Sequence, residues 1–160
     1  MNLEQKAQEF ATMAHTGQLR KDGKTPYINH CYGVVRLLKE IGIGDENILC
    51  SAWLHDVIED CGIEKEFNKE IARIVFVLTR NVNRERYKER IKNADFPIQI
   101  VKLADTVHNC SELERCLDKG TIKTKVKDCE EFYFDLARRI CPEFYEKLVF
   151  YIRPYTTRLG

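Results

Sequence analysis

Two histidines and two aspartates stand where their side chains could share a metal ion. His55 and Asp56 are adjacent at the end of one expected helix, and His30 lies at the start of the expected helix before it. Asp105 continues the mostly apolar run 100–104, where a carboxylate is costly to bury unless it is paired or bound to a cation. Two imidazoles and two carboxylates form a mixed nitrogen and oxygen ligand set, which suits Mn²⁺, Fe²⁺, Zn²⁺ or Ni²⁺ better than Ca²⁺. We therefore expect these four residues to be metal ligands.

Acidic side chains lie one helical turn beyond two of the candidate ligands. Glu59 is four residues after His55, and Asp60 is four residues after Asp56. If a helical turn persists there, each acid lies on the same face as the ligand that precedes it. Such acids could hold and polarise a water on the metal, so Glu59 and Asp60 are candidate catalytic residues.

Helices must position these side chains, because apolar residues recur at helical spacing along most of the chain. Asn29 and Asp45 are expected N-caps, Pro97 suits a first helical turn, and Pro142 is expected to stop or kink a helix. The expected helices cover about residues 3–16, 29–41, 45–56, 64–79, 80–93, 97–107, 122–140 and 143–151.

The connecting segments favour a single domain. Segment 17–27 contains two glycines and a proline, which predicts a loop. No segment shows the clear alternation of a strand, and most of the connections are short. We expect one compact all-α domain over residues 1–160.

Charge and composition exclude several classes of function. The chain has 26 basic and 25 acidic residues, and a net charge of +1 gives no electrostatic footprint for nucleic acid or an anionic membrane. No apolar stretch is long enough for a membrane span, and the N-terminus lacks the apolar core of a signal peptide. The seven cysteines have no CxxC spacing, which favours reduced thiols. We expect a cytoplasmic protein without nucleic-acid or membrane partners, and the oligomeric state stays open.

Three segments carry a resemblance to a known family. They read AHTGQLRKDGKTPYINH at 14–30, AWLHDVIED at 52–60 and VKLADTVHN at 101–109, and EFYFDLARR at 131–139 is a weaker fourth. The H…HD…D pattern resembles that of HD-domain metal-dependent phosphohydrolases. The closer similarity is to the hydrolase domain of the RelA/SpoT family, including its small stand-alone alarmone hydrolases. The resemblance extends over most of residues 7–140 and implies a compact HD-domain helical bundle.

The resemblance also implies an activity. Members of the family remove pyrophosphate from the 3′ position of ppGpp or pppGpp, which leaves GDP or GTP. The four candidate ligands match the residues that hold the metal, usually Mn²⁺. Glu59 and Asp60 match the acidic pair that positions the nucleophilic water.

Four more residues match substrate-binding positions of the family. Arg20 and Lys21 match a basic loop that approaches the phosphates or the base. Asn109 matches a residue near the ribose and base, and Tyr133 loosely matches a tyrosine near the phosphates. Tyr133 also fits a core position on an apolar helical stripe. The lysines at 119, 123, 125 and 127 predict a solvated helix face, with an entry funnel for an anionic substrate as the alternative.

Two other functions remain open at this stage. A phosphohydrolase on the same scaffold could act on another nucleotide: the 2′-phosphate of NADPH, a nucleoside phosphate or a cyclic nucleotide. A non-catalytic nucleotide sensor is the third hypothesis. The acidic pair argues against a sensor, because a protein that only binds has no need to activate water.

Overall fold

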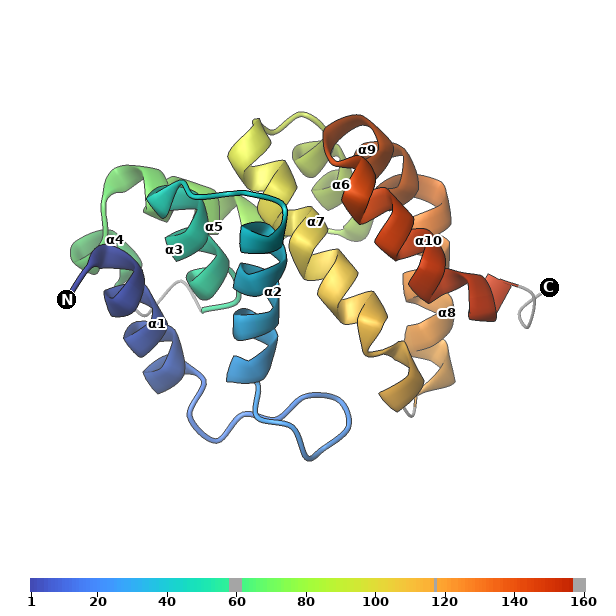
Figure 1. Ribbon diagram of the computed structural model, residues 1–160, viewed down its shortest axis with the longest axis horizontal. Helices are drawn as coiled ribbons and strands as arrows, with labels where there is room; N and C mark the ends of the chain where they lie inside the picture. The colour runs from blue at the N-terminus through green and yellow to red at the C-terminus, as the bar shows by residue number, and fades with distance from the viewer. Residues whose placement is uncertain (58–61, 117, 157–160) are drawn as a thin grey trace.

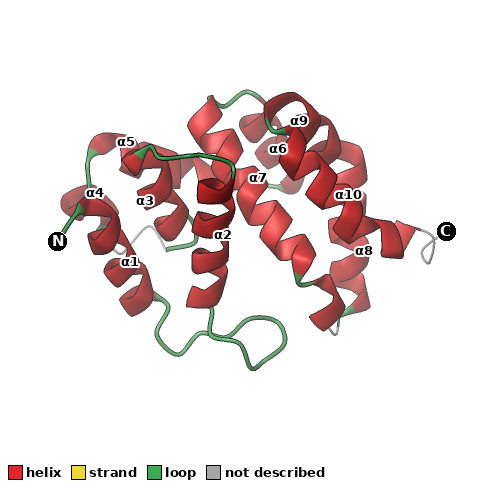
Figure 2. Cartoon of the chain, in the orientation of Figure 1, coloured by secondary structure: helices red, strands yellow, loops and turns green. Residues whose placement is uncertain are grey.

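The structure is a computed structural model that describes residues 1–57, 62–116 and 118–156, and it is built of helices over these ranges (Figure 2). The expected all-α fold class is confirmed. Within the described ranges, β-type pairing is limited to an isolated antiparallel bridge between Leu19 and Pro26, inside the predicted loop. In the same part of the chain, every helix is too short or too polar to cross a membrane.

The helices form two groups on either side of one long central helix (Figure 1). A 3₁₀ turn at Leu113–Arg115 follows that central helix, α7 (Phe96–Ser111). A π-helical turn at Cys129–Tyr133 joins α8 (Lys119–Asp128) to α9 (Phe134–Ile140). The elements in chain order are α1 (Leu3–Ala14), α2 (Ile28–Glu40), α3 (Glu46–Leu54), α4 (Ile63–Glu66), α5 (Lys69–Leu78), α6 (Arg84–Lys92), α7 (Phe96–Ser111), α8 (Lys119–Asp128), α9 (Phe134–Ile140) and α10 (Pro142–Thr156).

Local signals explain most helix boundaries and correct one expectation. Asp45 caps α3 as expected, because its side chain accepts a hydrogen bond from the backbone N–H of Ile48. Asn29 is not an N-cap but lies inside α2, whose cap is Tyr27. The helix begins earlier because the N–H of Asn29 already bonds to the carbonyl of Pro26, and the fixed φ of proline suits a helix start.

Two of the expected helices are interrupted. The segment expected at 64–79 is divided into α4 and α5, because Phe67 is extended and Asn68 caps a new helix. The segment expected at 122–140 is helical throughout, but the π turn at Cys129–Tyr133 widens it. Such a turn inserts an extra residue per turn, so it rotates the residues after it relative to a regular helix.

The apolar core surrounds α7, which packs against α2, α5 and α10. Leu103 on α7, Leu38 on α2, Ile71 on α5 and Phe144 on α10 are all fully buried. Burial of side chains of this size is the main favourable term in folding. The central position of α7 places one face of this helix toward α2 and α3, and that face carries Asp105.

We predict unequal effects for two phenylalanines on α10. Phe144 is fully buried and Phe150 is 73% exposed. Phe144→Ala should lower the free energy of unfolding by about 3–5 kcal/mol, because it leaves a cavity in the core. Phe150→Ala should change it by less than about 0.5 kcal/mol. Urea unfolding followed by circular dichroism measures both, and similar losses in the two variants would contradict this description of the core.

Candidate active site

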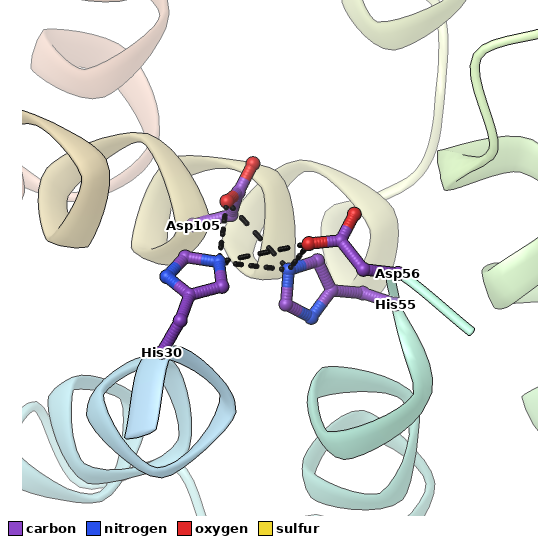
Figure 3. A group of neighbouring side chains, drawn as sticks. All are labelled: His30, His55, Asp56 and Asp105. Carbon is purple, nitrogen blue, oxygen red and sulfur yellow. Dashed lines mark hydrogen bonds and ion pairs between the residues drawn. The ribbon is translucent and has the colours of Figure 1, made fainter. Parts of the chain in front are cut away.

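The four candidate ligands come from three helices and converge at one point. His30 projects from α2, His55 and Asp56 from the C-terminal end of α3, and Asp105 from α7 (Figure 3). One ligand atom from each residue lies within 4.8 Å of the other three. The two imidazoles and Asp105 are buried, whereas the Asp56 side chain is 39% exposed. The cluster therefore has one side open to solvent.

The separations within the cluster fit a small divalent ion. His30 Nε2 lies 3.0 Å from Asp105 Oδ1 and 3.2 Å from His55 Nε2, and His55 Nε2 lies 2.9 Å from Asp56 Oδ2. Neighbouring ligands with bonds of about 2.1 Å to one ion are roughly 3 Å apart. His55 Nδ1 lies 2.7 Å from the carbonyl oxygen of Ala52, to which it donates, so its Nε2 presents a lone pair to the cluster. A cation removes the repulsion between such lone pairs.

His108 orients His30 from behind. The Nδ1 atoms of the two rings lie 2.8 Å apart. Burial lowers the pKa of His108 to about 4, and repulsion from His30 acts in the same direction. His108 is thus neutral at pH 7 and can accept the Nδ1 proton of His30, which leaves His30 Nε2 free for a metal. Gly33 makes room for this ring, because an added Cβ would lie 2.0 Å from His108 Nε2.

Asp105 is held by two neighbours on its own helix. Lys102 donates from Nζ to Oδ2 at 2.7 Å, and Asn109 donates from Nδ2 to Oδ1 at 2.6 Å. Burial alone would raise the pKa of Asp105, but Lys102 and the imidazoles of the cluster hold this pKa well below its usual range. Asp105 is therefore an anion near neutral pH, as a metal ligand must be. The sequence pattern that could have revealed Lys102 is its spacing of three residues before Asp105 in an apolar run.

Arg20 ties the loop at 17–27 to α7. Its Nε and Nη2 lie 2.9 and 2.6 Å from the same carboxylate oxygen of Glu112. Its Nη2 also donates to Asn109 Oδ1 at 2.7 Å, and the guanidinium carbon lies 5.1 Å from the centre of the Tyr27 ring. The hydroxyl of Tyr27 in turn donates to Asp56. The basic loop and the ligand cluster thus form one connected polar network.

A cavity of about 750 Å³ opens onto the cluster. Its size is in the range of small-molecule sites. Among the residues predicted to bind substrate, Lys21, Asn109 and Tyr133 line this cavity. Arg20 lines an adjoining cavity of about 60 Å³, which Lys21 and Asn109 share. The structure thus brings all four of these residues to the same region.

Several basic side chains outside the predicted set of site residues also line the large cavity. They are Arg80, Arg84, Lys88, Lys102 and Lys125. Lys88 is buried, although its charged segment was expected to be a surface helix. The lysines of α8 were expected on a solvated face, with an entry funnel as the alternative. Lys125 lines the cavity wall, whereas Lys119, Lys123 and Lys127 are exposed. Arg84 and Lys88 are spaced by one helical turn, which places both on one side of α6. This spacing does not tell whether that side faces the cavity or solvent.

Residues 7–140 match a family model described as HD domain. The chain belongs to the HD-domain family. Over 147 residues it is 36% identical to the guanosine-3′,5′-bis(diphosphate) 3′-pyrophosphohydrolase MESH1 of Xenopus tropicalis, covering 84% of this chain and 80% of that protein. It is 33% identical to the Borreliella burgdorferi guanosine-3′,5′-bis(diphosphate) 3′-pyrophosphohydrolase over 152 residues, which are 84% of this chain and 22% of that protein.

A solved structure has the same HD-domain fold. It belongs to a study described as "A metazoan ortholog of SpoT hydrolyzes ppGpp and plays a role in starvation responses". The two chains superpose with a TM-score of 0.72 at 27% identity, and the match covers 96% of each. The resemblance stated from the sequence is confirmed at the level of family and fold.

The two acids expected to act on water fall outside this description. Glu59 and Asp60 are not among the described residues, so their catalytic roles stay predictions. The roles of the other site residues of this HD domain also stay predictions, although the geometry brings those residues together.

Gly33 gives a test of how His30 is oriented. If the cluster holds a divalent metal, Gly33→Ala should weaken its binding about tenfold or more, because the added methyl displaces His108 and with it the hydrogen bond to His30 Nδ1. Gly44→Ala is the matched control, since an added Cβ there meets nothing within 4 Å. Titration calorimetry with MnCl₂ measures both affinities. Equal affinities in the two variants would show that His108 does not support the site.

Proposed function

We propose that this protein is a metal-dependent 3′-pyrophosphohydrolase of guanosine alarmones. It would convert ppGpp to GDP, or pppGpp to GTP, and release pyrophosphate. The observation that carries the proposal is the cluster of His30, His55, Asp56 and Asp105 at one end of a basic cavity. Support also comes from relatives named guanosine-3′,5′-bis(diphosphate) 3′-pyrophosphohydrolases.

The proposed cofactor is one Mn²⁺ ion, held by the four residues of the cluster. Their two imidazole nitrogens and two carboxylate oxygens suit a divalent transition metal. When bound, such an ion supplies a Lewis acid for phosphate oxygens and lowers the pKa of a water molecule. The polar network around the cluster keeps the ligands oriented: His108 holds His30, the carbonyl of Ala52 holds His55, and Lys102 with Asn109 holds Asp105.

The reaction is hydrolysis at phosphorus. The oxygen of water bonds to the inner phosphorus of the 3′-pyrophosphate, and the bond from this phosphorus to the ribose 3′-oxygen breaks. The 3′-oxygen takes up a proton, so the products are a 3′-hydroxyl and pyrophosphate. We assign to Glu59 and Asp60 the removal of the proton from the attacking water, which is typical work for a positioned carboxylate.

The cavity supplies charge for a highly anionic substrate. Lys21 reaches the cavity from the loop at 17–27. Its ammonium group donates to Thr121 Oγ1 at 3.4 Å, a long hydrogen bond that a phosphate oxygen could replace. Arg20 would exchange an oxygen of Glu112 for an oxygen of the substrate, since a guanidinium can bind two oxygens at once. Asn109 lies between the two cavities, where it could contact the nucleoside.

Tyr133 is buried and also lines the cavity. Its position is therefore compatible with both predicted roles, packing in the core and contact with the substrate phosphates. Burial raises its pKa to about 12. The hydroxyl therefore keeps its proton near neutral pH and could donate to a phosphate oxygen. The small-molecule partner we propose is a guanosine nucleotide, and the cytoplasmic location and the absence of a nucleic-acid partner stay predictions.

Purified protein should convert ppGpp to GDP and pyrophosphate when Mn²⁺ is present and lose this activity with EDTA, because the cluster cannot activate water without its ion. Chromatography of the nucleotide products measures the reaction. A parallel panel of NADPH, nucleoside phosphates and cyclic nucleotides tests the other substrates. Turnover of one of these but not of ppGpp would assign the site to another phosphohydrolase. Tight binding of ppGpp without turnover would make the protein a sensor.

Glu59→Ala and Asp60→Ala should each lower turnover of ppGpp by about 10²–10⁴-fold, because each removes a carboxylate that acts on the attacking water. Mn²⁺ binding should remain, since neither residue belongs to the ligand cluster. Glu64→Ala removes an exposed acid nearby and serves as the control. Turnover close to that of the wild type in both variants would remove the acidic pair from the mechanism.

A further inference from the structure

Lys125 is unusual among the basic residues of the large cavity. It is half-buried on α8, and among the described residues no acidic side chain lies within ion-pair distance of it. The other buried or half-buried cations there do have acidic partners. Lys102 lies 2.7 Å from Asp105, and Lys88 lies 3.0 Å from Asp128. Within the described residues, the charge of Lys125 therefore has no ion-pair partner.

A half-buried cation without an ion-pair partner works against the stability of the folded protein. Burial lowers the pKa of Lys125, attraction by Asp105 opposes this effect, and repulsion by Lys102 adds to it. Moving an ammonium group out of water without a counter-charge is costly. Residues that break a rule of stability in this way are typical of functional sites. An anionic ligand would supply the missing counter-charge.

The position of Lys125 indicates where that ligand would bind. Lys125 and Lys21 both line the large cavity and also the small one beside it. Lys21 comes from the loop at 17–27 and donates to Thr121, which lies one helical turn before Lys125 on α8. Two ammonium groups from distant parts of the chain thus approach the same face of α8. Asn109, which bonds to the candidate ligand Asp105, lines both cavities as well.

We propose that Lys125 and Lys21 form a subsite for the outer phosphate of the 3′-pyrophosphate. This inference rests on the proposed function and goes beyond it by naming what recognises the second phosphate. The inner phosphate is attacked beside Asp56 and Asp105, and the outer phosphate lies against the two ammonium groups. Lys125 acts as a specificity-determining residue, because a substrate with a single phosphate at the 3′ position does not reach it.

The test compares Lys125→Met with Lys127→Met. Lys127 is on the same helix with its side chain 68% exposed, so its loss should leave the cavity unchanged. The probe is inorganic pyrophosphate, titrated into protein loaded with Mn²⁺. We expect Lys125→Met to weaken pyrophosphate binding about tenfold or more, which is the size of a lost charge-assisted hydrogen bond. Lys125→Arg should restore most of the affinity, and Lys127→Met should bind like the wild type.

Two further readouts separate this role from a structural one. Lys125→Met should keep its affinity for Mn²⁺ and melt no earlier than the wild type, because the variant removes an unpaired charge. It should also lose preference for ppGpp over guanosine 5′-diphosphate 3′-monophosphate, measured as the ratio of the two kcat/KM values. Wild-type pyrophosphate affinity in Lys125→Met would overturn the proposal. A loss of affinity that comes with a lower melting temperature or lost Mn²⁺ would overturn it too.

The subsite and the proposed function can fail separately. If the wild-type protein does not hydrolyse ppGpp, the proposed function is wrong, but pyrophosphate titration still decides whether Lys125 binds phosphate. If the wild type hydrolyses ppGpp and Lys125→Met retains the full preference for a 3′-diphosphate, the proposed function stands and the subsite is wrong.

Discussion

The structure holds several electron-pair donors close together at its centre, and this grouping is the constraint on which the rest depends. The Nε2 atoms of His30 and His55 and a carboxylate oxygen of Asp105 meet within a domain whose surrounding core is apolar. Burying such groups is unfavourable unless a cation or protons are shared among them. The packing of α2 and α3 against α7 brings these groups together. The chemistry of the cluster therefore depends on how these three helices are arranged.

The surroundings of the cluster connect this centre to the cavity. Lys102 and Asn109 hold Asp105, and Asn109 also accepts a hydrogen bond from Arg20, which belongs to the loop at 17–27. A ligand that draws Arg20 away from Glu112 would therefore also disturb Asn109, which is hydrogen-bonded to both Arg20 and Asp105. The network gives a physical route by which a molecule bound in the cavity could influence the geometry of the candidate ligands.

The sequence predicted the parts of this protein that depend on local patterns. Helical spacing located α1, α3 and α7, and Asp45 and Pro97 marked helix starts because their effects act within one turn. The grouping of the four candidate ligands was predictable, because a carboxylate in an apolar helix needs a counter-charge. For the lysines of α8, the sequence left a solvated face and an entry funnel as alternatives, because their spacing does not tell which of them faces the cavity. The π turn at Cys129–Tyr133 also escaped prediction, because the apolar spacing over 122–140 fits a regular α-helix.

The most direct test of the central claim is crystallography of the protein with MnCl₂, using the anomalous scattering of manganese. The account predicts one strong anomalous peak between His30 Nε2, His55 Nε2, Asp56 and Asp105, at bonding distance from all four. A peak bound elsewhere, or none at this position in crystals grown with excess Mn²⁺, would contradict it.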